Sequence, residues 1–265
     1  MPTREIAFVV EPLVAHEAEG VKIRRTIGSE RLAILDPFML LDHLTLEAPT
    51  DGRVGFPRHP HRGIETLSYV IDGRVFHKDS LGNEDSVGQD EAQWMTAGRG
   101  IWHEEMLEAV DGKVEMLQLW FALPKADKMI APGYAAGRQL TVIDEDGTHV
   151  RDVSGAFSTI TGDPYIAQVD LNESEFACEV QNLATTAFYV FRGSVSVEGR
   201  EVEAGNLAVL GSGDEVRVIG SGRLLFISAM PLMEPILQYR SFVMNHPDDI
   251  RVVEEDIKSG RFGLE

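Results

Sequence analysis

The fold is decided by a short stretch of β-branched and aromatic residues, Thr66-Leu67-Ser68-Tyr69-Val70-Ile71, which Asp72-Gly73 closes. Asp72-Gly73 predicts a hairpin turn, because type I′ turns need positive φ values that Gly and Asp tolerate. Similar runs, separated by Gly, Asp and Asn, follow one another from about Ile23 to Leu232. Many evenly spaced short strands are typical of a sandwich or a barrel, so we predict an all-β chain.

The pattern around this stretch returns in the second half of the chain. Both Tyr69-Val70-Ile71-Asp72-Gly73-Arg74-Val75 and Tyr189-Val190-Phe191-Arg192-Gly193-Ser194-Val195 follow aromatic-apolar-apolar-x-Gly-x-Val, which indicates that both halves share one fold. The segment from Pro124 to Gln139 interrupts the strand pattern with Lys, Pro and Gly, as a linker does. We therefore predict two domains, residues 1–130 and residues 131–265.

Signals for a helix are concentrated at the end of the chain. Asn245 is a candidate N-cap, Pro247 fits the first turn, and Asp248 and Asp249 stand beside the positive end of the helix dipole. Gly260 follows as a stop signal. We expect one short C-terminal helix, whose acidic residues form a solvated face.

Composition and charge narrow the classes of function. The 265 residues are 43% hydrophobic and 25% charged, which is typical of a soluble globular protein. The net charge of −19 repels phosphate backbones and anionic lipids, so we expect no direct nucleic-acid partner. No apolar run is long enough for a membrane span and residues 1–15 do not read as a secretory leader, so we expect a cytoplasmic protein without membrane contact. The single cysteine, Cys178, is expected to be a buried structural thiol.

Two pairs of residues at i and i+2 carry the candidate chemistry. On a strand, His59 and His61 share one face, and so do His103 and Glu105. If the two strands are neighbours in a small barrel, their inward faces bring three imidazoles and one carboxylate together. The spacing therefore predicts a metal site with three histidines and one glutamate.

The chemistry of these ligands suits several first-row ions, namely Fe(II), Mn(II), Ni(II), Cu(II) or Zn(II). Four protein ligands in octahedral geometry leave two positions for water, substrate or dioxygen. The alternative is that His59 and His61 are surface residues flanked by Arg58 and Arg62, and that His103 makes a core hydrogen bond. The presence of two such pairs on predicted strands favours the metal site. Arg62 and Arg99 could steer an anionic or phenolic ligand toward the metal, but Arg62 falls on the opposite strand face from the ligands, so we expect a surface ion pair at least as much.

Two long stretches and several shorter ones resemble a known family. The long stretches are His59-Pro60-His61-Arg62-Gly63-Ile64-Glu65-Thr66 and Gln93-Trp94-Met95-Thr96-Ala97-Gly98-Arg99-Gly100-Ile101-Trp102-His103-Glu104-Glu105-Met106. They resemble the two signature stretches of the pirin family, members of the cupin superfamily. Shorter agreements are Asp36-Pro37-Phe38-Met39-Leu40-Leu41-Asp42-His43, Pro231-Leu232 with Glu234-Pro235, Phe242-Val243-Met244-Asn245 and Gly260-Arg261-Phe262-Gly263. The resemblance thus spans nearly the whole chain.

The resemblance implies a fold and a ligand set. It implies two cupin barrels of the double-stranded β-helix or jelly-roll type, with one mononuclear metal, commonly iron, in the N-terminal barrel. The matching metal ligands are His59, His61, His103 and Glu105. Glu65 is not a ligand in pirins, and either a hydrogen bond to an imidazole or a plain buried acceptor role is open for it. No histidine lies between His149 and His246, so we predict no metal in the C-terminal domain.

Two classes of function follow from the resemblance. Pirins resemble quercetin 2,3-dioxygenases, which implies a flavonol or other small phenolic substrate, O2, an Fe(II) cofactor and ring opening. Glu105 would then be both ligand and catalytic proton acceptor. The alternative is a non-enzymatic, metal- or redox-sensing regulatory protein that acts through contact with an unidentified protein partner. A different phenolic or enediol substrate at the same site is a third possibility.

Overall fold

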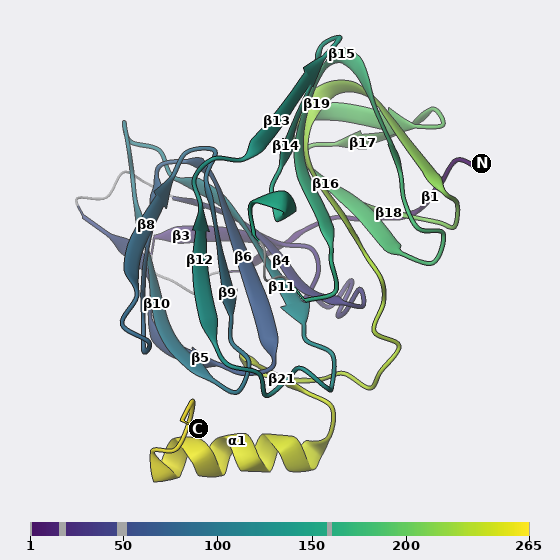
Figure 1. Ribbon diagram of the computed structural model, residues 1–265. Helices are drawn as coiled ribbons and strands as arrows, with labels where there is room; N and C mark the ends of the chain where they lie inside the picture. The colour runs from purple at the N-terminus through teal and green to yellow at the C-terminus, as the bar shows by residue number, and fades with distance from the viewer. Residues whose placement is uncertain (1, 16–19, 47–51, 158–160, 265) are drawn as a thin grey trace. The chain divides into compact units, whose positions relative to one another are not determined.

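The computed structural model describes residues 2–15, 20–46, 52–157 and 161–264, and strands dominate it (Figure 1). The chain forms two units, each assembled from three segments. We call one the site unit (Val14–Ile23, Phe38–Arg138 and Leu232–Glu265) and the other the companion unit (Met1–Leu13, Arg24–Pro37 and Gln139–Pro231). The predictions of a mostly β chain and of one C-terminal helix are confirmed.

The site unit contains two antiparallel sheets. A four-stranded sheet has the order β5 (Val54–His61), β10 (Ile101–Glu108), β7 (Arg74–Asp79) and β8 (Glu84–Gly88). A seven-stranded sheet has the order β12 (Gly133–Gly137), β9 (Ala92–Thr96), β6 (Ile64–Asp72), β11 (Glu115–Ala122), β4 (Phe38–Leu46), β3 (Val21–Arg25) and β2 (Leu13–Ala15). Val75 and Leu107 of the first sheet share a buried cluster with Val70 and Met116 of the second, so the sheets face each other across a common core.

The Asp72-Gly73 sequence is a corner between these sheets, and the prediction of a hairpin turn is wrong. β6 pairs with β9 and β11, whereas β7 pairs with β10 and β8. Gly73 has φ +83°, and a Cβ there would lie 2.7 Å from the carbonyl oxygen of Lys113. Glycine is therefore required where the chain crosses from one sheet to the other.

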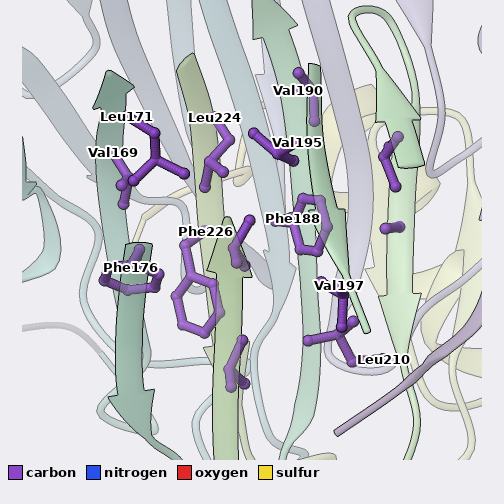
Figure 2. Close-up of a cluster of buried hydrophobic side chains, with 14 of the residues drawn as sticks. Val169, Leu171, Phe176, Phe188, Val190, Val195, Val197, Leu210, Leu224 and Phe226 are labelled. Carbon is purple, nitrogen blue, oxygen red and sulfur yellow. The ribbon is translucent and has the colours of Figure 1, made fainter. Parts of the chain in front are cut away.

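The companion unit is built around one antiparallel sheet. Its order is β1 (Ile6–Val10), β18 (Leu207–Leu210), β16 (Thr185–Val197), β19 (Glu215–Ala229), β15 (Tyr165–Glu179), β14 (Thr148–Asp152) and β13 (Thr141–Glu145), with β17 (Arg200–Glu203) beside β16. A short 3-10 helix, η1 (Ser154–Ala156), precedes β15. Figure 2 shows the core, in which Phe176, Phe188 and Phe226 project from three strands into one apolar cluster.

Two further sequence features take unexpected forms. Gly193 of the second repeat lies inside the continuous strand β16, with φ +67° and a register shift just before it. The segment from Pro124 to Gln139, predicted as a linker, contains the strand β12, which pairs with β9. A short edge strand with two glycines and two alanines carries too weak an alternation to predict from sequence.

The C-terminal segment of the site unit forms a small hairpin and the helix. β20 (Leu237–Tyr239) pairs with β21 (Phe242–Met244), and α1 runs from Pro247 to Ser259. The N-cap is His246 rather than the predicted Asn245, and the Asp249 carboxylate accepts the His246 main-chain N–H at 2.8 Å. Gly260 ends the helix at φ +73°, as predicted. Val253 packs with Phe242, Met244 and Phe262.

Among the residues that the structure describes, no helix is long and apolar enough to cross a membrane.

Candidate metal centre

Three histidines converge at one end of the four-stranded sheet. His59 and His61 lie on β5, His103 lies on β10, and His103 is directly opposite His59 in the register of the two strands. One ring nitrogen from each lies within 4.8 Å of the others. His61 and His103 are buried and His59 is half-buried. The i, i+2 pattern and the antiparallel pairing thus bring the three imidazoles together.

Main-chain carbonyls fix the tautomers of two of these imidazoles. His59 Nδ1 lies 2.9 Å from the Pro57 carbonyl oxygen, and His61 Nδ1 lies 3.1 Å from that of Ser241. Because a carbonyl oxygen only accepts, each Nδ1 carries a proton, and a ring in this tautomer has its lone pair on Nε2. The two Nε2 atoms are 2.9 Å apart, and two lone pairs at that distance are stabilised by a cation between them.

His103 completes the test of whether the residues fit a metal. Both of its ring nitrogens are buried and have no hydrogen-bond partner among the described residues. Burial, followed by the neighbouring His61, His59 and His77, lowers its pKa well below the ordinary value. Burial, followed by His59, lowers the pKa of His61 to about 3. Neutral imidazoles with bare nitrogens are the form that binds a divalent metal, so this donor set fits one.

Glu105 lies beside this cluster and is held by the facing sheet. β10 alternates regularly between inward and outward residues, so His103, Glu105 and Leu107 all point inward. Glu105 Oε1 accepts hydrogen bonds from Ser68 Oγ at 2.9 Å and Gln93 Nε2 at 2.7 Å, and Oε2 accepts one from Gln118 Nε2 at 2.5 Å. The convergent group contains the three histidines without Glu105. Its role as fourth ligand stays a prediction.

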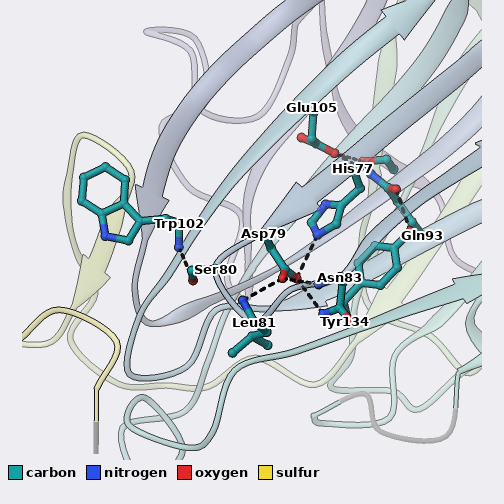
Figure 3. A network of polar contacts seen from close by, with 10 residues as sticks. His77, Asp79, Ser80, Leu81, Asn83, Gln93, Trp102, Glu105 and Tyr134 are labelled. Atoms are coloured by element: carbon teal, nitrogen blue, oxygen red, sulfur yellow. Dashed lines mark hydrogen bonds and ion pairs between the residues drawn. The ribbon is translucent and has the colours of Figure 1, made fainter.

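Aromatic and polar side chains surround the cluster. The Trp120 ring stands edge-on to His61, with 4.9 Å between centroids. Tyr134 Oη donates to Gln93 Oε1 at 3.2 Å and so extends the network that reaches Glu105 (Figure 3). Burial raises the pKa of Tyr134, which keeps this hydroxyl protonated as a donor.

Two further residues of the same network, His77 and Asp79, were not predicted from the sequence; His77 is buried, and the side chain of Asp79 is covered from solvent (Figure 3). His77 lies directly opposite Glu105 on the neighbouring strand. The signal was present, because His77-Lys78-Asp79 has the same i, i+2 spacing that identified the other pairs.

Arg62 does not form the surface ion pair that we expected. Its side chain is buried, Nη1 lies 2.9 Å from Asp256 Oδ2 on α1, and Nε donates to the Arg99 carbonyl oxygen at 2.6 Å. The expectation is wrong because α1 supplies the partner from 194 residues away. Asp256 is correspondingly part of a buried contact and not of a fully solvated helix face.

Two other buried polar residues, Glu65 and His43, have defined partners. Glu65 Oε1 accepts a hydrogen bond from Thr96 Oγ1 at 2.6 Å. His43 Nε2 lies 2.5 Å from Glu115 Oε1, and both side chains are buried. The pairing of His43 agrees with a hydrogen-bonded core histidine.

Comparison with known proteins gives matches over nearly the full chain. The family model for pirin matches residues 20–121, and the model for the pirin C-terminal cupin domain matches residues 167–263. A pirin-like protein of Caulobacter vibrioides is 34% identical over 99% of this chain and 100% of its own. The crystal structure of quercetin 2,3-dioxygenase from Acinetobacter baumannii superposes with a TM-score of 0.89 at 29% identity, covering 99% of both chains. A bacterial pirin from Escherichia coli, in complex with nickel(II), superposes with a TM-score of 0.70 at 20% identity, covering 84% of this chain and 99% of the other.

Proposed function

This chain belongs to the pirin family, and we propose that it is a metal-dependent dioxygenase that opens the ring of a flavonol such as quercetin. The observation that carries the proposal is the convergence of three imidazoles within 4.8 Å, one of which, His103, has two buried ring nitrogens without a partner among the described residues. The proposed ligands are His59, His61, His103 and Glu105. The proposed cofactor is a single divalent metal ion, with Fe(II) as the first choice and Mn, Ni, Cu or Zn as alternatives. The likeness to a solved quercetin 2,3-dioxygenase supports the choice of substrate.

A metal held by these residues would act as a Lewis acid, lowering the pKa of a coordinated hydroxyl and offering open positions to substrate and O2. The chain's own contribution is to orient a carboxylate beside that position. Ser68, Gln93 and Gln118 donate to both oxygens of Glu105 and fix its plane. We propose that Glu105 accepts the proton of the flavonol 3-hydroxyl, as a positioned base does.

The overall reaction conserves all atoms. One flavonol and one O2 give one ring-opened ester and one carbon monoxide, with both oxygen atoms retained in the products. The two carbon–carbon bonds that flank the carbon bearing the 3-hydroxyl break, and that carbon leaves as carbon monoxide. The proton held at Glu105 returns to the ester product, so no external oxidant or reductant is needed beyond O2.

The test is oxygen uptake by anaerobically Fe(II)-loaded protein on addition of quercetin, with the metal content of each preparation measured. We expect uptake by the wild type and loss of both metal and uptake in His61→Ala. His149→Ala, which removes a histidine of the companion unit, is the matched control and should retain both.

The outcomes separate the two classes of function. One bound iron per chain without uptake would overturn quercetin as the substrate and favour a metal-sensing regulatory role or a different phenolic or enediol substrate. Absence of bound metal in the wild type would overturn both. Glu105→Gln should lower turnover strongly and retain part of the metal affinity, and unchanged turnover would remove Glu105 from the mechanism.

A further inference from the structure

We propose that His77 is a substrate-binding residue that accepts a hydrogen bond from a hydroxyl of the phenolic substrate, and that Asp79 holds His77 in the tautomer this requires. The inference rests on the proposed function, because it concerns a ligand bound beside the three histidines. It adds a determinant of specificity that lies outside the proposed metal ligands.

Asp79 is fixed as a hydrogen-bond acceptor. Its side chain is fully buried and receives four donors. Leu81 N and Asn83 N reach Oδ1 at 2.9 and 3.0 Å, and Asn83 Nδ2 and His77 Nε2 reach Oδ2 at 2.8 and 3.1 Å (Figure 3). A carboxylate accepts at both oxygens and donates from neither, so it matches all four partners.

Asp79 selects the tautomer proposed for His77. Nε2 faces a carboxylate oxygen and carries a proton, and in the tautomer with hydrogen on Nε2 alone the lone pair lies on Nδ1. That Nδ1 atom is buried and has no hydrogen-bond partner among the described residues. Buried polar atoms are nearly always partnered, so a bare acceptor in an otherwise saturated network points to a ligand that supplies the donor.

His77 lies next to the candidate metal centre. The His77 and His103 ring centroids are 5.4 Å apart, and His77 is opposite Glu105 in the strand register. Tyr134 stacks on His77 with 4.1 Å between centroids and 14° between planes, which fixes the ring plane. His77 is therefore held on one edge by Asp79 and on one face by Tyr134, while Nδ1 is left without a protein donor.

The chemistry of the partner follows from the acceptor. A buried imidazole nitrogen with a lone pair accepts a hydrogen bond from an O–H or N–H group. It cannot form a hydrogen bond with an ether or a carbonyl oxygen, because these groups only accept. Phenolic and enolic hydroxyls are the donors that a flavonol carries. His77 would thus favour hydroxylated aromatic substrates over their O-methylated forms.

The test measures tautomer and binding separately. In Zn(II)-loaded protein labelled with 15N in histidine, the ring nitrogen shifts of His77 should show a protonated Nε2 and a bare Nδ1. Quercetin affinity is then measured by its absorbance shift. We expect His77→Phe, which keeps a flat ring against Tyr134, to bind quercetin at least about tenfold more weakly. Zinc content and the circular-dichroism spectrum of the folded protein should be unchanged.

The variant Asp79→Asn shows whether quercetin binding depends on the tautomer of His77 or only on the packing of its ring. An amide can donate to Nε2 and so moves the ring proton to Nδ1, which should weaken quercetin binding as much as His77→Phe does and reverse the 15N pattern. Lys78→Ala, whose side chain on the same strand is exposed, is the matched control and should bind as the wild type does.

Each remaining outcome decides the matter. Equal quercetin affinity in wild type and His77→Phe would overturn this inference and leave the proposed function standing. Loss of zinc from His77→Phe would make His77 a metal ligand and also overturn it. Failure of the metal-loaded wild type to bind quercetin would overturn the proposed function, and this inference with it.

Discussion

His61 Nδ1 donates a hydrogen bond to the main-chain carbonyl of Ser241, a residue 180 positions further along the chain. Ser241 lies between β20 and β21, and its Oγ donates to the Pro60 carbonyl oxygen at 2.6 Å. Ser241 of the C-terminal segment therefore forms two hydrogen bonds with β5, one to its backbone and one to an imidazole. Such partners orient a metal-binding histidine and set its tautomer.

Loss of the Ser241 hydroxyl removes its hydrogen bond to the Pro60 carbonyl oxygen and should let the His61 side chain move more freely. We expect Ser241→Ala to weaken metal affinity by about tenfold, at the lower end of the range for such partners, with little change in fold. Competition against a chromophoric chelator measures the affinity. Ser259→Ala, which removes a serine hydroxyl at the exposed end of α1, is the control and should leave affinity unchanged. Equal affinities in all three proteins would contradict the role given to Ser241.

The ion pair between the buried Arg62 and the partly buried Asp256 should be sensitive to removal of the carboxylate charge. Asp256→Asn leaves the guanidinium of Arg62 buried beside Phe262 without its counter-charge, and we expect a loss of about 3 kcal/mol in the free energy of unfolding. Urea denaturation measures it. Glu255→Gln, at an exposed neighbouring position, should change stability by less than about 0.5 kcal/mol. A similarly small change in Asp256→Asn would show that the pair is solvated.

Lys128 predicts a pH dependence of stability. It is buried, and its Nζ donates to the Gly63 carbonyl oxygen at 3.1 Å. Burial lowers its pKa from 10.5 to about 8, although the charges of Glu234 and Asp249 act in the opposite direction. Between these two pH values the unfolded chain binds the proton more tightly than the folded one, so this group's contribution to stability rises with pH.

The measurement is the difference in unfolding free energy between wild type and Lys128→Met. The wild type should gain up to about 3 kcal/mol relative to the variant as pH rises from 8 to 10.5. Other titrating groups are the same in both proteins and cancel in the difference. A difference that stays flat over this range would contradict a charged, desolvated ammonium group below pH 8.

Cys178 should react slowly with thiol reagents. The thiol is free and partly buried against the companion unit's core, and burial raises its pKa to about 12 in spite of the neighbouring Arg4 charge. Because the thiolate is the nucleophile, we expect reaction with an aromatic disulfide at pH 8 to be about a thousandfold slower than in unfolded protein. Rates taken with and without denaturant measure this. Equal rates would mean that the thiol is solvated.

The sequence predicted the histidines of the site because their spacing is local. A strand places i and i+2 on one face whatever surrounds it, so His59 and His61 could be paired from sequence, and His103 with Glu105. The same rule places His77 and Asp79 on one face of their strand. The sequence alone does not show that this strand is the neighbour of the one that carries His103, so the pair was not recognised as part of the site. The Ser241 contact and the Arg62–Asp256 pair join residues 180 and 194 positions apart, and no periodicity encodes such distances.

The fold class could be predicted from the sequence, whereas the order and pairing of the strands could not. Alternation along β10 and the repeated Gly turns indicate strands with inward faces, and the strands are present. Whether Gly73 closes a hairpin or turns a corner depends on which strands pair, which is set by packing across the core. For the same reason, the sequence did not indicate that terminal segments join units formed mainly by the opposite half of the chain.

The pairing of β1 with β18, in which Ile6 lies opposite Leu210, sets an order of events on the ribosome. At a synthesis rate of about 5–20 residues per second, the partner strand of β1 is made on the order of ten to forty seconds after β1 itself. The strand that carries His59 and His61 waits in the same way for Ser241. Neither unit can therefore be completed cotranslationally as a consecutive piece, and a nascent chain exposes unpaired strand edges until its final segments are made. A chain that ends before Leu207 lacks the partner strand of β1, and one that ends before Ser241 lacks the hydrogen-bond acceptor of His61.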